Sequence, residues 1–392
     1  MRQSRISRKP LWGLFFLWSI CLLHPTIASA EQGIFTPKIM LQSTYDDNVV
    51  FKGKGDFEFR ITPSVKMEYG AEDWNIKGGG KAALFRYADL TKYERENYDI
   101  WLGGEKDLSE RFQVNFDTSF AYDHTFVDEL TQSGTETTPT LRRKYAFTPG
   151  AMWSVTEKDQ LSFSVPLSQT KYAGRTNPDS TSTGGVVGWT HILNNERTSL
   201  LAQGTYNHHY FRRSDGKTNQ DVFTMMGGAS YKPSELINLV GYLGLGYADS
   251  KVTLTGSSDK TKKTVYPSFD LSGTYSREKW KFTLGADRMV SPSIYGESSL
   301  RTRGRASGEY FFTERLSAYL ETAYYNTETG GLVTDNKTRT YYVRPWLMYR
   351  WSEDSTIRLE YKHTDIKNRI TDATKHQNRV GIRFEYSYPV FY

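Results

Sequence analysis

Apolar and polar side chains alternate along this chain over stretches as long as a membrane-spanning strand, and this alternation limits the possible folds more than any other feature. From Phe57 to Tyr69, aromatic and aliphatic residues occupy nearly every second position, with charged or hydroxylated residues between them. The pattern recurs at residues 111–123 and 264–275. A period of two places the two sets on opposite faces of a β-strand. Each such strand is therefore expected to have one dry face and one wet face.

Short polar turns recur at a regular spacing and separate two possible folds. They are centred near Asp73, Glu110, Lys158, Asn195, Glu235, Glu278, Glu314 and Glu353, so they lie 37, 48, 37, 40, 43, 36 and 39 residues apart. Longer polar stretches lie between them, as expected for a barrel with short turns at one end and longer loops at the other. A soluble β-sandwich also has one dry face, but its strands usually have about 5 or 6 residues. The pattern predicts about 18 strands, with 16 as the nearest alternative.

Aromatic residues flank the short turns, for example Tyr69 and Trp74, or Tyr275 and Trp280. Such pairs are typical of the aromatic girdle of a transmembrane barrel, although hairpin packing alone also produces them. After residue 30, the sequence has no run of 18 apolar residues that could form a transmembrane helix. We therefore predict one all-β domain over residues 31–392, an antiparallel up-and-down transmembrane β-barrel.

The N-terminus has the three parts of a cleaved secretory signal peptide. Four basic residues precede the apolar residues 11–23, and Ala28-Ser29-Ala30 is a small-residue cleavage site. Thirteen apolar residues are too few for a spanning helix, which needs about 20. Residues 1–30 are thus predicted to be a signal peptide, and the mature barrel is predicted to reside in the outer membrane of a Gram-negative-type bacterium.

Charge and cysteine content exclude several function classes. The chain has 50 basic and 44 acidic residues, and residues 1–30 contain four basic and no acidic ones, which leaves 46 − 44 = +2 after cleavage. The basic pI thus reflects the leader, and nucleic-acid binding loses its support. The single cysteine, Cys21, also lies in the leader. The mature chain is expected to have no disulfide and no thiolate site.

Basic residues are expected to line the inside of the barrel. Arg301, Arg303 and Arg305 alternate with small residues, so they share one face, and that face must meet water because one Arg costs about 2–4 kcal/mol near the bilayer midplane. The other predicted pore-lining basic residues are Arg344, Arg350, Arg358, Lys362, Arg142, Lys144, Lys77 and Lys81. These residues either guide anions or pair with carboxylates across strands to hold the wall. Aromatic residues expected on the same face, as a sliding surface for sugars or as packing, are Phe85, Tyr87, Trp101, Tyr342 and Trp346.

No catalytic, metal or cofactor site is predicted. His208 and His209 are adjacent, so they point to opposite faces of a strand and cannot hold one metal together. The remaining histidines of the mature chain, His124, His191, His363 and His376, are scattered along the sequence, and no serine lies in a Gly-x-Ser-x-Gly motif. We therefore expect a protein that is not an enzyme.

The C-terminus has an apolar face that includes Phe384 and Tyr386, and together with Gly381 it resembles the signal that the barrel-assembly machinery reads on the last strand. Six residues follow Tyr386, and the chain ends in Tyr392 where Phe is usual. The resemblance implies assembly by that machinery into a membrane of lipid and lipopolysaccharide.

The segment Tyr45-Asp46-Asp47-Asn48, at the end of the first expected strand, resembles the entry motif of a family of outer-membrane β-barrel porins associated with exopolysaccharide or capsule biosynthesis loci. The resemblance implies export of an anionic polysaccharide together with periplasmic export components, without catalytic residues. Asp and Asn also cap tight turns, which is the simpler explanation of the motif. The alternatives are a general diffusion porin for small solutes with a preference for anions, and a surface hydrolase or adhesin.

Overall fold

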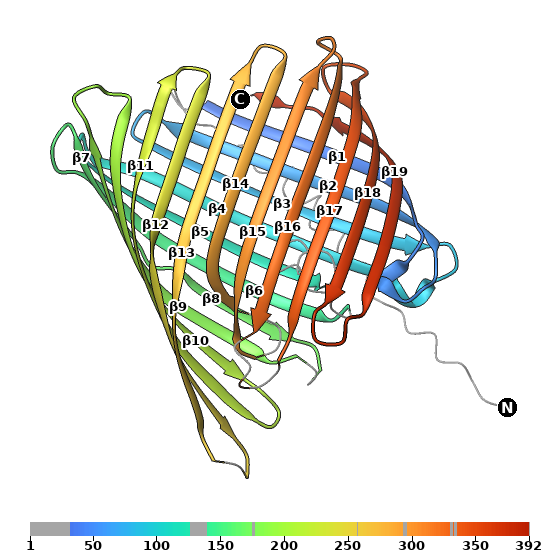
Figure 1. The fold of residues 1–392 in the computed structure, drawn as a ribbon. Helices are drawn as coiled ribbons and strands as arrows, with labels where there is room; N and C mark the ends of the chain where they lie inside the picture. The colour runs from blue at the N-terminus through green and yellow to red at the C-terminus, as the bar shows by residue number, and fades with distance from the viewer. Residues whose placement is uncertain are drawn as a thin grey trace.

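The computed structural model describes residues 32–125, 139–174, 177–256, 258–292, 296–329, 332 and 335–391. In this part of the chain, one antiparallel sheet closes on itself, and tilted strands follow one another around the wall in sequence order (Figure 1). The first strand closes the barrel by pairing with the last long one, from Lys38↔Ser387 to Asp46↔Arg379. The predicted signal peptide lies outside the described residues.

The described strands are β1 (Gln32–Asp46), β2 (Asp56–Ala71), β3 (Trp74–Tyr87), β4 (Arg95–Ser109), β5 (Phe112–His124), β6 (Leu141–Ser154), β7 (Asp159–Ser164), β8 (Leu167–Tyr172), β9 (Asp179–Ile192), β10 (Thr198–Arg212), β11 (Gly216–Ser234), β12 (Ile237–Leu254), β13 (Lys260–Arg277), β14 (Trp280–Pro292), β15 (Ser298–Phe311), β16 (Leu316–Thr329), β17 (Lys337–Arg350), β18 (Ser355–Asn368), β19 (Thr374–Ser387) and β20 (Val390–Phe391). Two single-turn 3₁₀ helices, η1 (Val49–Phe51) and η2 (Thr91–Tyr93), lie in the loops after β1 and β3.

The strand count agrees with the sequence pattern. β7 and β8 both pair with β6 on one side and with β9 on the other, so they are two halves of one wall strand. β20 pairs only with the start of β1. The described residues therefore form a closed wall of 18 strands, and the predicted antiparallel barrel is confirmed. A closed wall has no strand edge, which satisfies the backbone in hydrocarbon.

The two faces of the wall differ as the alternation predicts. On β2, the side chains of Phe57 and Phe59 are 49% and 50% exposed on the outside, whereas Glu58 between them is buried on the inside. At the short-turn end, Tyr69 packs edge-on against Trp74 at a centroid distance of 5.4 Å, and Trp280 lies 4.2 Å from Tyr310. The outside therefore has an apolar belt with an aromatic girdle. Among the described residues, no helix is long and apolar enough to span a bilayer.

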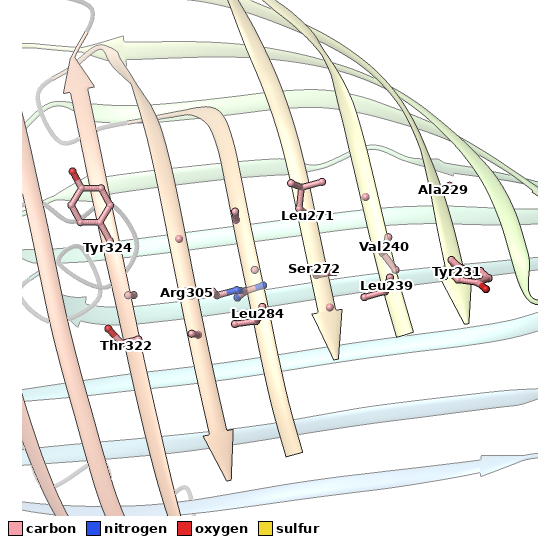
Figure 2. Close-up of a pocket in the computed structure, with 17 residues that line it drawn as sticks. Ala229, Tyr231, Leu239, Val240, Leu271, Ser272, Leu284, Arg305, Thr322 and Tyr324 are labelled. Carbon is pink, nitrogen blue, oxygen red and sulfur yellow. The ribbon is translucent and has the colours of Figure 1, made fainter. Parts of the chain in front are cut away.

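A depression of about 700 Å³ lies across β11–β16 (Figure 2). Leu271 and Leu284 border it, and Gly273, Gly304 and Ala306 leave it open because their side chains are small. These residues belong to the outer face, where the two leucines are well exposed. The depression therefore faces lipid and is not part of a path through the barrel.

Candidate functional site: the charged inner wall

The basic residues predicted to line the pore all belong to the inner face of the wall. Each alternates with residues of the outer face on its own strand, as Arg344 and Arg350 do with the exposed Leu347 and Tyr349 on β17. The inward set comprises Lys77, Lys81, Arg142, Lys144, Arg301, Arg303, Arg305, Arg344, Arg350, Arg358 and Lys362. Their partners divide them into groups with different roles.

The arginine row of β15 shares one buried carboxylate on the neighbouring strand. Asp287 of β14 accepts hydrogen bonds from Arg301 at 3.1 Å and from Arg303 at 2.6 Å. Arg305 lies over Gly285, where a Cβ atom would come within 2.7 Å of its Nε (Figure 2). Two of the three arginines are therefore held by Asp287, and Arg305 is the exposed member of the row.

Other predicted basic residues also have carboxylate partners across strands. Arg142 of β6 donates two hydrogen bonds of 2.7 and 2.9 Å to the carboxylate of Asp123 of β5, and both side chains are buried. Lys81 lies 3.4 Å from Asp99 and Lys77 lies 3.5 Å from Glu68, in partly exposed pairs. The buried pair fixes the wall, whereas exposed pairs contribute little to stability.

A buried ion network crosses the seam where β19 meets β1. Arg379 of β19 lies 3.5 Å from Asp46 of β1 and 3.3 Å from Glu58 of β2. Glu58 also lies 3.3 Å from Arg95 of β4 and accepts a 2.6 Å hydrogen bond from the Tyr87 hydroxyl of β3. We call these five residues the seam network. It ties five strands together at the closure of the barrel.

The Tyr45-Asp46-Asp47-Asn48 motif clamps the same seam. The carboxylate of Asp47 accepts hydrogen bonds from the backbone and side-chain nitrogens of Asn378 at 2.7 and 2.6 Å. Asn48 donates from its side chain to the carbonyl of His376 and accepts from the amide of Gly53, which closes the turn. Tyr45 packs on the outside against Phe57, with ring centroids 5.1 Å apart. The motif is thus both a turn and a clamp on the last strand.

Several inward cations lie over aromatic rings, and three of them form a separate group. Arg60 lies over the ring of Phe85 at 5.5 Å, Arg358 over Trp346 at 4.8 Å and Lys362 over Tyr342 at 4.7 Å. Within the part of the chain that the structure describes, none of the three has a carboxylate oxygen within 4.0 Å. We call them the aromatic-held cations. Their charges are available to the lumen because no direct ion pair neutralises them.

Most of the aromatic residues predicted as a sliding surface for sugars are packed into the wall. Phe85, Tyr87 and Tyr342 are only 5–6% exposed, so of the two alternatives they follow packing and offer no sliding surface. They are covered because long basic side chains from neighbouring strands lie across their rings, as Arg95 does at 4.0 Å from Phe85. Trp346 is half-buried and stacks on Tyr319 with centroids 3.7 Å apart. Trp101 is 39% exposed on the inner face.

Two segments turn inward at the long-loop end, which the sequence pattern did not predict. Val49, Val50 and Phe51 pack against Tyr87 and Ile366 of the inner face. Three consecutive apolar residues inside a polar loop were the signal that could have identified this contact.

The second inward segment comes from β14 and β15. Val290 and Leu300 pack against a cluster formed by Val222, Ala248 and Tyr266 on the inner faces of β11–β13. β14 pairs with β13 only as far as Phe269↔Arg288, so its end is free to leave the wall. Both segments narrow the lumen.

Two of the histidines expected to be scattered meet at one carboxylate. His363 of β18 and His376 of β19 lie 3.1 and 2.5 Å from Asp365, so the expectation is wrong for this pair. Antiparallel pairing around the β18–β19 loop brings them together, with Asp365↔His376 in register. The prediction for His208 and His209 is confirmed, because His208 bonds to Asp221 outside and His209 to Ser182 inside.

The residues of the predicted assembly signal belong to the last wall strand. Phe384 and Tyr386 of β19 are exposed on the outer face. Gly381 lies on the inner face, where a Cβ atom would come within 2.7 Å of Thr44 Oγ1 of β1. Tyr392 lies outside the described residues. Recognition by the assembly machinery remains a prediction.

Comparison with known proteins supports the fold. No protein-family model and no curated protein matches the sequence. Among solved structures, the chain is similar to the copper transporter OprC, with 10% identity, a TM-score of 0.53 and coverage of 90% of this chain and 64% of OprC. The chain thus spans less than two thirds of the length of OprC. OccAB3 of Acinetobacter baumannii is 11% identical, with a TM-score of 0.48 and coverage of 92% and 99%. At these identities, the similarity to OprC shows the fold alone.

The fold and the two faces of its wall define the class of protein. The wall is a closed antiparallel barrel with an apolar belt and aromatic girdle outside and charged residues inside. These are the features of outer-membrane β-barrels. The chain is an outer-membrane β-barrel.

Proposed function

We propose that this barrel is a pore for anionic solutes and that its substrate is an acidic polysaccharide on its way out of the cell. The observation that carries the proposal is the set of aromatic-held cations, Arg60, Arg358 and Lys362, on one side of the inner wall. Fixed cations in a narrow, water-filled passage attract anions and repel cations.

The arrangement of these cations suits a polymer with repeated carboxylates. Arg358 and Lys362 are four residues apart on β18, which separates them by about 13 Å along the strand. Trp346 lies on the neighbouring strand beside Arg358, and the exposed part of its half-buried side chain can contact a passing sugar. Stacking together with a nearby cation holds a charged sugar ring weakly enough for it to move on.

A second candidate is passive diffusion of small anions. The inward packing of Val49–Phe51 and of the ends of β14 and β15 favours it, because both segments narrow the long-loop end. The two candidates share the same cations and differ in the size of solute that passes.

Planar-bilayer recording distinguishes them. The purified barrel should conduct, with a reversal potential that shows anion preference in a salt gradient. Polygalacturonate should then produce brief, voltage-dependent blocks, whereas neutral dextran of the same length should not. Anion preference without any polymer block would support small-anion diffusion. Absence of conductance, or cation preference, would contradict both candidates.

A further inference from the structure

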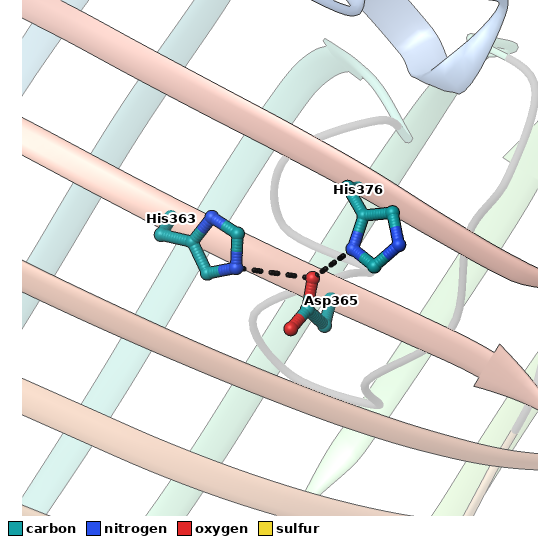
Figure 3. A group of neighbouring side chains, drawn as sticks. All are labelled: His363, Asp365 and His376. Atoms are coloured by element: carbon teal, nitrogen blue, oxygen red, sulfur yellow. Dashed lines mark hydrogen bonds and ion pairs between the residues drawn. The ribbon is translucent and has the colours of Figure 1, made fainter.

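We propose that the outer wall carries a divalent metal site of the zinc type, formed by His363, Asp365 and His376 at the long-loop end of the seam (Figure 3). The site is separate from the inner wall and does not depend on what passes through the barrel.

The hairpin of β18 and β19 brings the three ligands together. His363 pairs with Asn378 and Asp365 pairs with His376, so the three side chains share the outer face of two adjacent strands. One Asp365 oxygen lies 3.1 Å from Nε2 of His363 and 2.5 Å from Nδ1 of His376, and all three ligand atoms lie within 4.8 Å of one another. A zinc ion about 2.0–2.2 Å from each atom needs them roughly 3–3.6 Å apart, which small side-chain shifts provide.

Hydrogen bonding fixes which nitrogen of His363 faces the site. The side-chain nitrogen of Asn378 donates to Asp47, which can only accept, so the Asn378 oxygen points to His363. This oxygen lies 2.7 Å from Nδ1 of His363 and also accepts from the Tyr361 hydroxyl. Nδ1 must therefore carry a proton, and the other nitrogen of the neutral ring presents its lone pair.

That lone pair faces a carboxylate oxygen 3.1 Å away. Two acceptors at this distance repel each other unless a proton or a cation lies between them. A ligating histidine whose second nitrogen is held by an amide or carboxylate is the usual outer shell of a metal site. The hydrogen bond between Asn378 and Nδ1 of His363 therefore leaves the lone pair of Nε2 available to bind a metal.

The donor set selects the kind of ion. Two imidazoles and one carboxylate suit zinc and neighbouring transition ions, whereas calcium and magnesium prefer oxygen ligands alone. The side chains of His363, Asp365 and His376 are 28%, 36% and 63% exposed, so water can complete the coordination. Three protein ligands and an open position make an exchangeable site.

The site lies on the outer face where an ion can reach it without crossing hydrocarbon. Tyr361 precedes it on the outer face of β18, and Tyr341 of β17 lies beside it in register with Asp365. The exposed Lys367–Asp372 pair follows it in the direction of the loop. Aromatic residues mark the interface and charges mark the water side. The metal would bridge β18 and β19 directly beside the clamp formed by Asp47 and Asn48, and so stabilise the closure of the barrel.

Zinc binding to the full-length mature barrel in detergent tests the site, with an untagged protein because a histidine tag binds zinc itself. After chelator treatment and buffer exchange, competition with a chromophoric zinc indicator should reveal one site per chain. Asp365→Asn and His376→Asn should each weaken binding at least tenfold. Asn378→Ala should weaken it by about 10- to 100-fold, because it frees the ring of His363.

The matched control is His208→Asn, which removes another outward histidine–aspartate pair, His208 and Asp221 at 2.9 Å. It should leave zinc binding unchanged. Absorption bands of bound Co²⁺ give a second readout: they should appear in the wild type and in His208→Asn, and disappear in His376→Asn. Equal binding by wild type and His376→Asn, or equal loss with His208→Asn, would overturn the proposal. If a variant fails to fold, as judged by heat-dependent migration on gels, absence of Co²⁺ bands in the folded wild type would still overturn it.

Discussion

The arginine row of β15 and the aromatic-held cations face the same lumen, and both come from strands with the same alternation. Their partners differ. Arg301 and Arg303 share Asp287, whose side chain is only 5% exposed. Arg358 and Lys362 instead lie over the rings of Trp346 and Tyr342. A buried carboxylate neutralises a guanidinium group and fixes it to the wall, whereas an aromatic ring positions a cation and leaves its charge intact.

The comparison shows that the number of inward arginines does not measure the charge that a permeating ion meets. The row of β15 looks strongly basic in the sequence, yet two of its three charges share a counter-ion. Selectivity should depend on the aromatic-held cations, and wall stability on the buried pairs. Four variants test this division, from the largest expected effect to the smallest.

Asp287→Asn should destabilise the barrel most. It removes the carboxylate that the buried Arg301 shares with the half-buried Arg303. Removal of one partner from a buried pair costs about 3–5 kcal/mol. Urea titration of the folded barrel in detergent or lipid measures the free energy of unfolding. Asp270→Asn is the matched control, because Asp270 is exposed on the inner face of the adjacent β13. Similar stability of the two variants would show that the β15 row is not held by Asp287.

Asp46→Asn should destabilise the barrel less, by about 1–3 kcal/mol, because a hydrogen-bonded buried charge is lost. Asp46 accepts from Gln377 at 2.9 Å and lies near Arg379, but Arg379 keeps Glu58 as a second partner. Asp372→Asn, on an 83% exposed side chain at the same end of the barrel, should leave the unfolding free energy unchanged. A larger loss of unfolding free energy for Asp46→Asn than for Asp287→Asn would show that the seam network stabilises the barrel more than the β15 row does.

The sequence predicts the face of a residue far better than its neighbours across strands. Alternation places Phe57 outside and Glu58 inside, because a strand has only two faces. The aromatic girdle and the count of 18 wall strands follow from the same local pattern and the turn spacing. These features depend on contacts within one hairpin.

Contacts between strands can be predicted only when the register of the two strands is known, and the register depends on how each loop folds. The sharing of Asp287 by two arginines, and the meeting of His363 with His376, both result from pairing across neighbouring strands. The β18–β19 hairpin could have shown the second case, since pairing Asp365 with His376 follows once the turn is centred between them. The pattern of polar residues does not locate that centre, because a shift of one residue changes every pair.

Selectivity should change when two aromatic-held cations are removed. One unit charge about 7 Å away changes the energy of an ion in water by roughly 0.6 kcal/mol, or about threefold in local concentration. Arg358→Gln with Lys362→Gln should therefore reduce the anion-to-cation permeability ratio at least threefold, as measured by reversal potentials in a low-salt gradient. The control, Asp287→Asn with Arg301→Gln, removes one negative charge from β14 and one positive charge from the β15 row, and should leave the ratio unchanged. If the control variant shifts the reversal potential as much as the double substitution does, selectivity does not depend on the aromatic-held cations alone.

Trp346→Leu should have the smallest and most specific effect. The indole ring stacks on Tyr319, lies beneath Arg358 and is half-buried, so its loss removes an aromatic contact for a sugar but no charge. Aromatic stacking contributes about 0.5–1.5 kcal/mol, so blocks by polygalacturonate should shorten by roughly 2- to 10-fold. Small-ion selectivity should remain, since Arg358 keeps its place on the inner face. Trp101→Leu is the control, because Trp101 is exposed on the inner face of β4, where it lies against Gly79. A shifted reversal potential with unchanged block times would contradict this prediction. It would show that the Trp346 ring positions the charge of Arg358 and does not contact the polymer.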